Sequence, residues 1–232
     1  MKSLVVLSGA GISAESGIPT FRDADGLWEG HDVMEVATPE GWKKNPALVL
    51  DFYNQRRKKA LEVKPNRGHE ILAELEQHFN VTIVTQNVDN LHERAGSTNV
   101  IHLHGSLFES RSSVDERLVY PINGWELKIG ERCEKGSQLR PNIVWFGEMV
   151  PLMEVAAHHA SKADFFIVVG TSMAVYPAAG LVDYVPMSTP KYVVDPKVPD
   201  LRHIPLVEGV GEKGSVGLEI VRKKLLEVVG NR

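Results

Sequence analysis

A glycine-rich turn near the start of the sequence has the spacing of a phosphate-binding loop. Four apolar residues, Leu4 to Leu7, precede it, and Gly9, Gly11 and Ala14 fit the dinucleotide-binding pattern G-x-G-x-x-G/A. Glycine has no Cβ, so the backbone can turn tightly and approach a pyrophosphate, to which free N–H groups and a helix dipole offer positive potential. The pattern alone has low specificity, because a Gly-rich strand-to-helix turn is often only a tight connection.

The segment after this turn separates two classes of dinucleotide-binding protein. A dehydrogenase-type unit would place a second apolar strand, ending in a ribose-binding acid, roughly 20 residues after the turn. Residues 17–28, GIPTFRDADGLW, predict an irregular loop instead. A loop suits a lid over a bound dinucleotide better than a hydride-transfer scaffold, so an ordinary dinucleotide oxidoreductase is the disfavoured interpretation.

Polar side chains follow the next apolar run, residues 81–84. Gln86, Asn87 and Asp89 come directly after it. At a strand end, two amides and one carboxylate offer donors and acceptors for a ribose and for the carboxamide of nicotinamide. Asn87 and Asp89 could instead only cap the following helix, and their types alone favour that interpretation. Their combination with the glycine turn favours a ligand site.

Two histidines end the third apolar run. Strand alternation places His102 and His104 on the same side, which is compatible with a metal pair, but no nearby cluster of His or Cys supplies further ligands. One imidazole that titrates near neutral pH is the more economical use, as a general base. The alternative is a hydrogen-bonded histidine at a strand end.

Tyr53 and Arg56 are separated by three residues in a segment of helical spacing, so they lie on one face of the expected helix. The planar arginine fork suits a carboxylate, and a tyrosine hydroxyl adds a donor. The pair could therefore bind an acidic group of a substrate. Against this, Arg56 belongs to the charge run Gln55–Lys59, and such a run is usually a solvated helix face.

Five apolar runs must position these groups. They are residues 4–7, 81–84, 100–103, 165–169 and 191–194, and segments of helical spacing alternate with them. This alternation predicts an α/β, Rossmann-like fold, with a mostly parallel sheet, helices on both faces and ligands outside the carboxyl ends of the strands. A last periodic run, Val216 to Val229, predicts a surface helix that closes the sheet.

Two segments interrupt the alternation and predict a small domain made from two insertions. Residues 31–67 are rich in charge and of helical spacing, and residues 110–141 have scattered charge and little periodicity. We expect the Rossmann-like domain to be formed by residues 1–30, 68–109 and 142–232. A helix that opens at Pro65–Asn66 and ends near Phe79 leads from the first insertion back to the sheet.

The composition limits the possible partners and compartments. A net charge of −4 gives no support for a nucleic-acid or membrane-surface partner, and no apolar stretch is long enough to span a bilayer. The N-terminus passes directly into the glycine turn without a signal-peptide cleavage region, which favours a cytoplasmic protein. Cys133 is the one cysteine in the sequence, which excludes an intramolecular disulfide and an all-cysteine metal site.

Four motifs, in order along nearly the whole chain, resemble the sirtuin family of NAD-dependent protein-lysine deacylases. Gly9 to Arg22 matches the motif GAGxSxxSGIPxFR, and Thr85 to His92 is similar to TQNxDxLH. Residues 104–107 match HGxL, and residues 170–178 match GTSxxVxPA. The Tyr53 and Arg56 pair resembles the Y-x-x-R pair of bacterial and mitochondrial members that prefer acidic acyl groups.

The resemblance implies NAD as cofactor and acylated protein lysines as substrates. It implies that the acyl oxygen attacks C1′ of the nicotinamide ribose, that nicotinamide leaves, and that the general base His104 activates a ribose hydroxyl, with Asn87 as the second catalytic residue. The cofactor-binding residues implied are Gly9, Ala10, Gly11, Ser13, Ile18, Phe21, Arg22, Trp28, Gln86, Asn87, Asp89, Gly170, Thr171, Ser172 and Val216. The substrate-binding residues implied are Tyr53, Arg56, Val144, Phe146, Gly147 and Glu148, the last four in an extended strand that could pair with a peptide.

The sequence departs from the family pattern at two places. Sirtuins commonly carry two CxxC pairs that bind a structural zinc, whereas this chain has Ser112, Ser113 and only Cys133, so we predict no metal. Val193 stands where the family often has an asparagine that contacts the adenine ribose, and Asp195 is a candidate replacement. These departures leave one further alternative, a non-catalytic module that senses NAD or ADP-ribose; intact His104 and Asn87 favour the enzyme.

Overall fold

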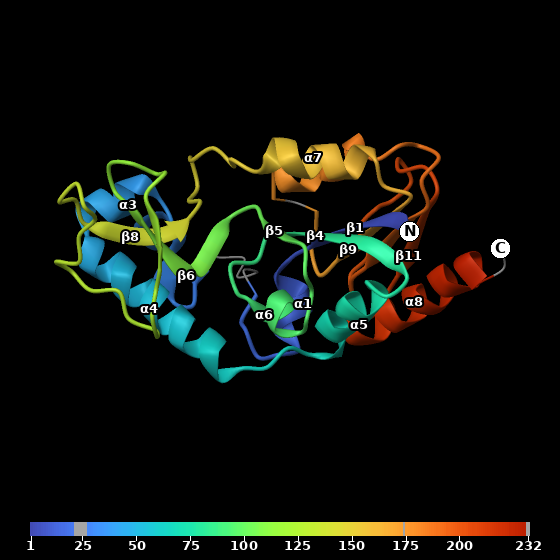
Figure 1. Ribbon diagram of the computed structural model, residues 1–232, viewed down its shortest axis with the longest axis horizontal. Helices are drawn as coiled ribbons and strands as arrows, with labels where there is room; N and C mark the ends of the chain where they lie inside the picture. Colours follow the sequence, from blue (N-terminus) through green and yellow to red (C-terminus); the bar gives the residue numbers. More distant parts are fainter. Residues whose placement is uncertain (21–26, 174, 231–232) are drawn as a thin grey trace.

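A six-stranded, fully parallel sheet forms the larger of two lobes in the computed structural model, which describes residues 1–20, 27–173 and 175–230 (Figure 1). The strand order is β11-β10-β9-β1-β4-β5. Their bounds are β1 (Lys2–Ser8), β4 (Phe79–Thr85), β5 (Val100–His102), β9 (Phe165–Val169), β10 (Lys191–Val194) and β11 (Val207–Val210). The chain leaves the central strand β1 for β4 on one side and later reaches β9 on the other, so the strand order reverses beside β1. A crevice at such a switch point is where open α/β sheets bind ligands.

Alternate residues of the strands enter two separate cores, which explains why the runs are apolar throughout. Leu4 and Val6 of β1 pack into one core, and Val5 and Leu7 into the other. The first core holds α5 (Arg67–Leu75) and α8 (Gly214–Gly230), and the second holds α7 (Met153–Ser161) and the 3₁₀ helix η1 (Ala178–Tyr184) (Figure 1). The predicted fold class, a parallel sheet with helices on both faces, is therefore confirmed.

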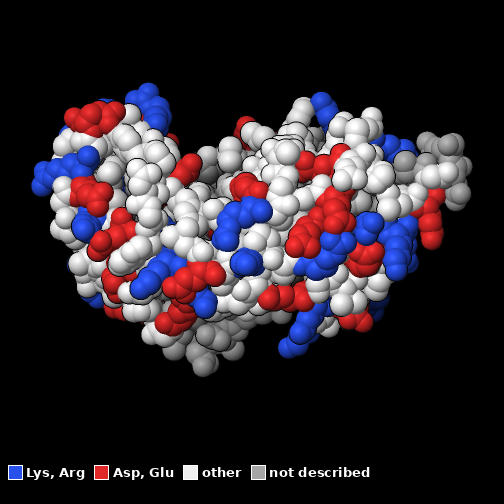
Figure 2. Space-filling model, turned by 60° about the horizontal axis from the view of Figure 1, so that its bottom comes forward, with Lys and Arg blue, Asp and Glu red and all other residues white. Residues whose placement is uncertain are grey.

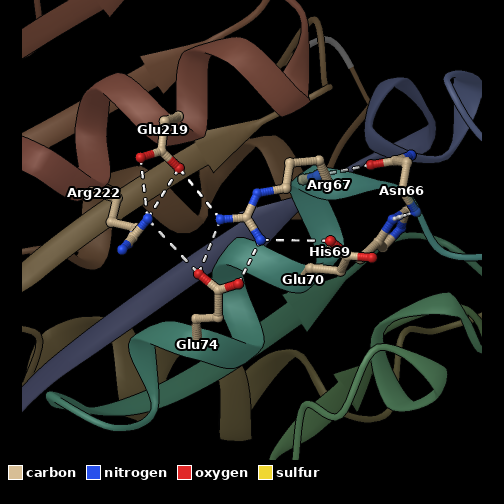
Figure 3. Close-up of polar contacts among 8 residues, drawn as sticks. Asn66, Arg67, His69, Glu70, Glu74, Glu219 and Arg222 are labelled. Carbon is tan, nitrogen blue, oxygen red and sulfur yellow. Dashed lines mark hydrogen bonds and ion pairs between the residues drawn. The ribbon is translucent and has the colours of Figure 1, made fainter.

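An ion-pair network joins α5 to α8 across this first core. Arg67 contacts Glu74 on its own helix and lies 3.5 Å from Glu219 of α8, while Arg222 lies 3.1 Å from Glu219 and 3.8 Å from Glu74 (Figure 3). The side chains are partly exposed, so the network adds orientation more than stability. Acidic and basic side chains are interspersed over the face drawn in Figure 2, in keeping with the small net charge.

The smaller lobe is built from two separate parts of the chain. The first contributes β2 (Leu27–Trp28), β3 (His31–Asp32), α2 (Val33–Val36), α3 (Pro39–Lys44) and α4 (Pro46–Glu62). The second contributes an antiparallel sheet of β6 (Gly105–Ser112), β7 (Val119–Pro121) and β8 (Leu139–Ile143), in the order β7-β6-β8. Asn45 caps α4 by accepting a hydrogen bond from the amide of Leu48, as its position before Pro46 predicts.

Three local expectations differ from the structure. The strand β11 was not expected, and α5 ends at Leu75 because the turn after it returns the chain to β4, which begins at Phe79. Residues 144–148 are not a strand. β8 ends at Ile143, and the carboxylate of Glu148 accepts a hydrogen bond from the Trp145 amide at 2.8 Å, which turns the chain.

Among the described residues, no helix is long and apolar enough to cross a bilayer.

The charge run of α4 is divided between three environments, because successive residues of a helix point about 100° apart. Arg56 faces the space between the lobes, Arg57 is fully buried, and Lys58 is exposed with its Nζ 5.4 Å from the Trp125 ring. Arg57 donates to the carbonyls of Leu107 and Trp125, and burial lowers its pKa to about 10. It therefore ties α4 to β6 and to the β7–β8 loop.

Replacing Arg57 with methionine is expected to lower the free energy of unfolding by roughly 2–4 kcal/mol, because the buried carbonyl of Leu107 and the partly buried carbonyl of Trp125 lose a charged donor. Urea unfolding followed by tryptophan fluorescence measures this change. Lys58→Met, one position further on the exposed side, is the matched control and is expected to change stability by less than about 0.5 kcal/mol. Equal losses in the two variants would contradict the role given to Arg57.

Candidate active site

A cavity of about 280 Å³ lies between the carboxyl ends of the sheet and the smaller lobe. Its floor is formed by the turns that follow β1, β4 and β9, and its far wall by α4 and the segment after β8. The switch point of the sheet thus opens into a space that both lobes enclose.

The turn after β1 packs backbone to backbone against the turn after β9. The amide of Gly9 donates to the Val169 carbonyl at 3.0 Å, and the amide of Gly11 donates to the Gly170 carbonyl at 2.8 Å. A Cβ on Gly11 would lie 2.6 Å from the Gly170 Cα. The sequence suggested that these two amides would be free to bind a phosphate, but both are used in hydrogen bonds between the turns. The glycines are needed because they let the two strand ends meet.

Asn87 and Asp89 are buried beneath the cavity and held by Ser13 of α1 (Ala10–Ala14). The Asn87 amide donates to the Ser13 hydroxyl and the Gly9 carbonyl, each at 3.1 Å. One Asp89 oxygen accepts from Ser13 at 3.0 Å, and the other accepts from the Leu91 amide at 3.0 Å. Asp89 therefore joins the cavity floor to the start of α6 (Leu91–Arg94). Its carboxylate binds the first amide of this helix and is at the same time part of the site. Burial raises the pKa of Asp89.

Two buried histidines, His69 and His92, lie beneath the cavity floor and are uncharged. His69 lies 3.4 Å from the Ser13 hydroxyl, and His92 lies 2.9 Å from the Ser8 hydroxyl, with the two imidazole centres 4.9 Å apart. Burial lowers the pKa of His69 to about 4 and that of His92 well below its ordinary value. Both rings are consequently uncharged at neutral pH and add no positive charge beneath Asp89.

His104 presents one nitrogen to the cavity in a fixed protonation pattern. Its Nδ1 lies 3.1 Å from the Gln86 carbonyl, which can only accept, so Nδ1 carries the proton. The other nitrogen, Nε2, is therefore the basic one. Burial lowers the pKa of His104 below its ordinary value, which keeps the ring neutral at physiological pH.

His102 is held differently, although it lies two residues away. Its Nδ1 donates to the Asn87 carbonyl at 3.0 Å, and its Nε2 lies 2.6 Å from the Glu93 carboxylate. Burial lowers the pKa of His102, but the Glu93 carboxylate outweighs burial and the net shift is upward. His102 thus orients the backbone of Asn87 from outside the cavity, as a hydrogen-bonded histidine at the end of β5.

Aromatic and aliphatic side chains form the wall on the side of the smaller lobe. Tyr53 is fully buried, and its hydroxyl accepts a hydrogen bond from the Trp145 indole at 3.0 Å, with burial raising its pKa. Phe146 is about half exposed, and its amide donates to the Ala37 carbonyl at 3.0 Å, which fixes the segment after β8 against α2. This side of the cavity is therefore largely apolar, and Phe146 lies at the surface.

Arg56 lies in this wall and is not solvated. Its side chain is 8% exposed, and its guanidinium is 4.1 Å from the Trp28 ring centre and 5.5 Å from that of Phe52. Glu29, whose side chain is 31% exposed, places a carboxylate oxygen 3.2 Å from Arg56 Nη1. Burial lowers the pKa of Arg56, and Glu29 opposes that shift.

A family model described as the Sir2 family matches residues 9–177, nearly three-quarters of the chain. The chain belongs to the Sir2 family. An NAD-dependent protein deacylase of Bacteroides thetaiotaomicron is 54% identical over 231 residues, covering 97% of this chain and 99% of that protein. Among solved structures, a Sir2 homolog in complex with NAD is 39% identical, with a TM-score of 0.87 and coverage of 98% of this chain and 90% of that one. A Sir2 protein bound to acetylated peptide is 30% identical, with a TM-score of 0.76 and coverage of 98% and 93%.

Most residues assigned from the Sir2-like motifs line this one cavity. They are Gly9, Ala10, Gly11, Ser13, Ile18, Trp28, Tyr53, Arg56, Gln86, Asn87, Asp89, His104, Val144, Phe146, Gly147, Glu148, Gly170, Thr171 and Ser172. Phe21 and Arg22 lie outside the described residues. Val216 lies on the exposed first turn of α8 and is not among the lining residues, so its assignment remains a prediction.

Two charged lining residues, Glu29 and Lys59, were not predicted from the sequence. Glu29 follows Trp28 in a segment without periodicity, so nothing local connects it to Arg56; only the packing of β2 against α4 brings them together. Lys59 lies three residues after Arg56, and this helical spacing was the available signal. Glu148 lines the cavity, but its carboxylate is bonded to Arg111, Arg140 and the Trp145 amide, so it shapes the segment after β8.

The two departures from the Sir2 pattern lie away from the cavity. Cys133 has its sulfur 3.3 Å from the Ser112 hydroxyl and 3.1 Å from that of Ser137, and these hydroxyls are 2.9 Å apart. An apolar cluster containing Leu50 surrounds this triangle. Val193 is buried in the second core of the sheet, as its apolar side chain requires.

Proposed function

We propose that this protein is an NAD-dependent protein-lysine deacylase. The observation that carries the proposal is that His104, with a basic nitrogen in a fixed tautomer, shares one cavity with the glycine turn, with Asn87 and Asp89, and with an apolar wall that reaches the surface at Phe146. A cavity that combines a dinucleotide floor with an apolar wall suits a reaction between NAD and an acylated lysine. The activity named for the Bacteroides thetaiotaomicron relative, over nearly its whole length, supports the same conclusion.

The residues of the floor fit NAD. A Cβ on Gly9 would lie 2.7 Å from the Thr171 Cβ, so glycine is needed there for the turns after β1 and β9 to form one floor. Asn87 and Asp89 offer an amide and a carboxylate to a nicotinamide carboxamide and a ribose. When bound, NAD supplies the ribose carbon that accepts the acyl oxygen as nicotinamide leaves.

His104 is the proposed general base. Because the Gln86 carbonyl holds the proton on Nδ1, Nε2 can take a proton from a ribose hydroxyl without a change of tautomer. Asn87 and Asp89 are fixed by Ser13, so they hold their ligand without rearrangement. The buried part of the apolar wall, at Tyr53 and Trp145, shields the acyl-lysine chain from water.

We further propose that acidic acyl groups, such as succinyl and malonyl, are accepted together with acetyl. Arg56 is a buried cation in the cavity wall, three residues from Tyr53 on the same helix face. A carboxylate at the end of an acyl chain could form charge-assisted hydrogen bonds with it. Its burial argues against the interpretation of Arg56 as part of a solvated charge run.

Arg56→Met is expected to lower kcat/KM for a succinyl-lysine peptide by about 10- to 100-fold, because a charge-assisted contact is lost, with little change for the matched acetyl-lysine peptide. Nicotinamide release from NAD measures both rates. Lys58→Met, a change of the same charge on the exposed side of α4, is the control and leaves both rates unchanged. Equal loss for the two peptides would contradict the acidic-acyl proposal, and no release from wild type with either peptide would instead support an NAD or ADP-ribose sensor.

A further inference from the structure

The carboxylate position beside Arg56 is filled by the protein itself. Glu29 Oε2 lies 3.2 Å from Arg56 Nη1, and both residues line the cavity. Arg56 Nε is buried and donates to no atom of the described residues. The guanidinium lies over the ring of Trp28. Its ion-pair partner among the described residues is the carboxylate of Glu29, which lines the cavity.

The other two carboxylates of the cavity are hydrogen-bonded to groups other than Arg56. Asp89 accepts hydrogen bonds from Ser13 and the Leu91 amide, and Glu148 accepts from two arginines and the Trp145 amide. Among the described residues, Glu29 has Arg56 as its one ion-pair partner. Glu29 is therefore the acid whose position is tied to Arg56.

The surroundings of Glu29 allow it to move. Its side chain is 31% exposed, whereas that of Arg56 is 8% exposed. Glu29 lies in the two-residue turn between β2 and β3, with a φ of 50°, outside any helix or longer strand. Released from Arg56, its carboxylate can be hydrated, whereas Arg56 remains buried and needs a counter-charge.

We propose that Glu29 is a specificity-determining residue: an internal carboxylate that pairs with Arg56 until an acidic acyl chain displaces it. This inference rests on the proposed binding of acyl-lysine in this cavity. Two carboxylates close to one guanidinium repel each other, so a succinyl chain must expel Glu29, while an acetyl chain has no carboxylate and leaves the pair intact. Glu29 thereby reduces the advantage that Arg56 gives to acidic acyl groups and keeps the enzyme open to neutral ones.

Glu29→Gln, which keeps the side-chain size and removes the charge, tests this. We expect the Kd of a succinyl-lysine peptide, measured by isothermal titration calorimetry, to fall by about 2- to 5-fold, the range expected for one partly exposed competing charge. The Kd of the acetyl-lysine peptide is expected to change less than about twofold. Glu35→Gln removes an exposed acid of α2 and is the matched control, with no change for either peptide.

The effect must depend on Arg56. In an Arg56→Met background, Glu29→Gln is expected to give no selective gain for the succinyl peptide, which a double-mutant cycle measures. Unchanged or weaker succinyl binding in the single variant would overturn the inference, and so would equal gains for both peptides. Binding is measured without turnover, so the two proposals can fail separately. A gain in succinyl binding without nicotinamide release would support the role of Glu29 and reject the deacylase. Nicotinamide release without that gain would support the deacylase and reject the role of Glu29.

Discussion

Replacing His104 with alanine is expected to lower kcat for nicotinamide-linked deacylation by about 10²- to 10⁴-fold, the range for loss of a general base. The ring is held in one tautomer by the Gln86 carbonyl, and no other imidazole lines the cavity among the described residues. NAD affinity is expected to change little, because the turns after β1, β4 and β9 carry the dinucleotide floor. Steady-state deacylation and NAD calorimetry measure the two quantities.

The pH dependence gives this prediction a second readout. His104 must be neutral to accept a proton, and burial lowers its pKa below the ordinary value of about 6.5. We therefore expect kcat/KM of the wild type to be level above pH of about 6.5 and to fall only at lower pH, as the ring becomes protonated. His158→Ala, at an exposed histidine of α7, is the control and retains full activity. Retention of more than a tenth of the wild-type rate in His104→Ala would contradict the assignment of the base.

The parallel sheet could be predicted from sequence because its central strands are buried on both faces. The strands β1, β4, β9 and β10 are mostly apolar and almost fully buried, and such runs carry their signal locally. β11 differs, because Glu208 and Gly209 in its centre are exposed and only its pairing with β10 makes it a strand. An edge strand of four residues has too little apolar pattern to be recognised without its neighbour.

The charge run of α4 shows what the sequence leaves open. Arg56, Arg57 and Lys58 are chemically alike and adjacent, yet one lines the cavity, one is fully buried and one is exposed. Which cation faces which way depends on how α4 rotates against β6 and the segment after β8. The ion pair with Glu29 depends on that same packing, so neither partner could be assigned from spacing alone.

Replacing Gly170 with alanine is expected to lower the free energy of unfolding by about 3–4 kcal/mol and to abolish NAD binding. Gly170 has a φ of +64°, and a Cβ there would lie 2.3 Å from the Ile12 amide nitrogen and 2.7 Å from the Gly11 carbonyl carbon. Both are backbone atoms, which cannot move without separating the turn after β1 from the turn after β9. The hydrogen bond from Gly11 to the Gly170 carbonyl would be strained or lost.

The matched control separates this contact from the backbone conformation itself. Gly136 has a φ of +75°, but a Cβ there would meet nothing within 4 Å. Gly136→Ala is therefore expected to lower the free energy of unfolding by about 1 kcal/mol, because alanine disfavours the left-handed backbone conformation, and to leave NAD binding intact. Urea unfolding and NAD calorimetry compare the two variants. If they lost equal stability, the meeting of the two turns would not be a close contact, and the floor of the cavity would owe its shape to another part of the chain.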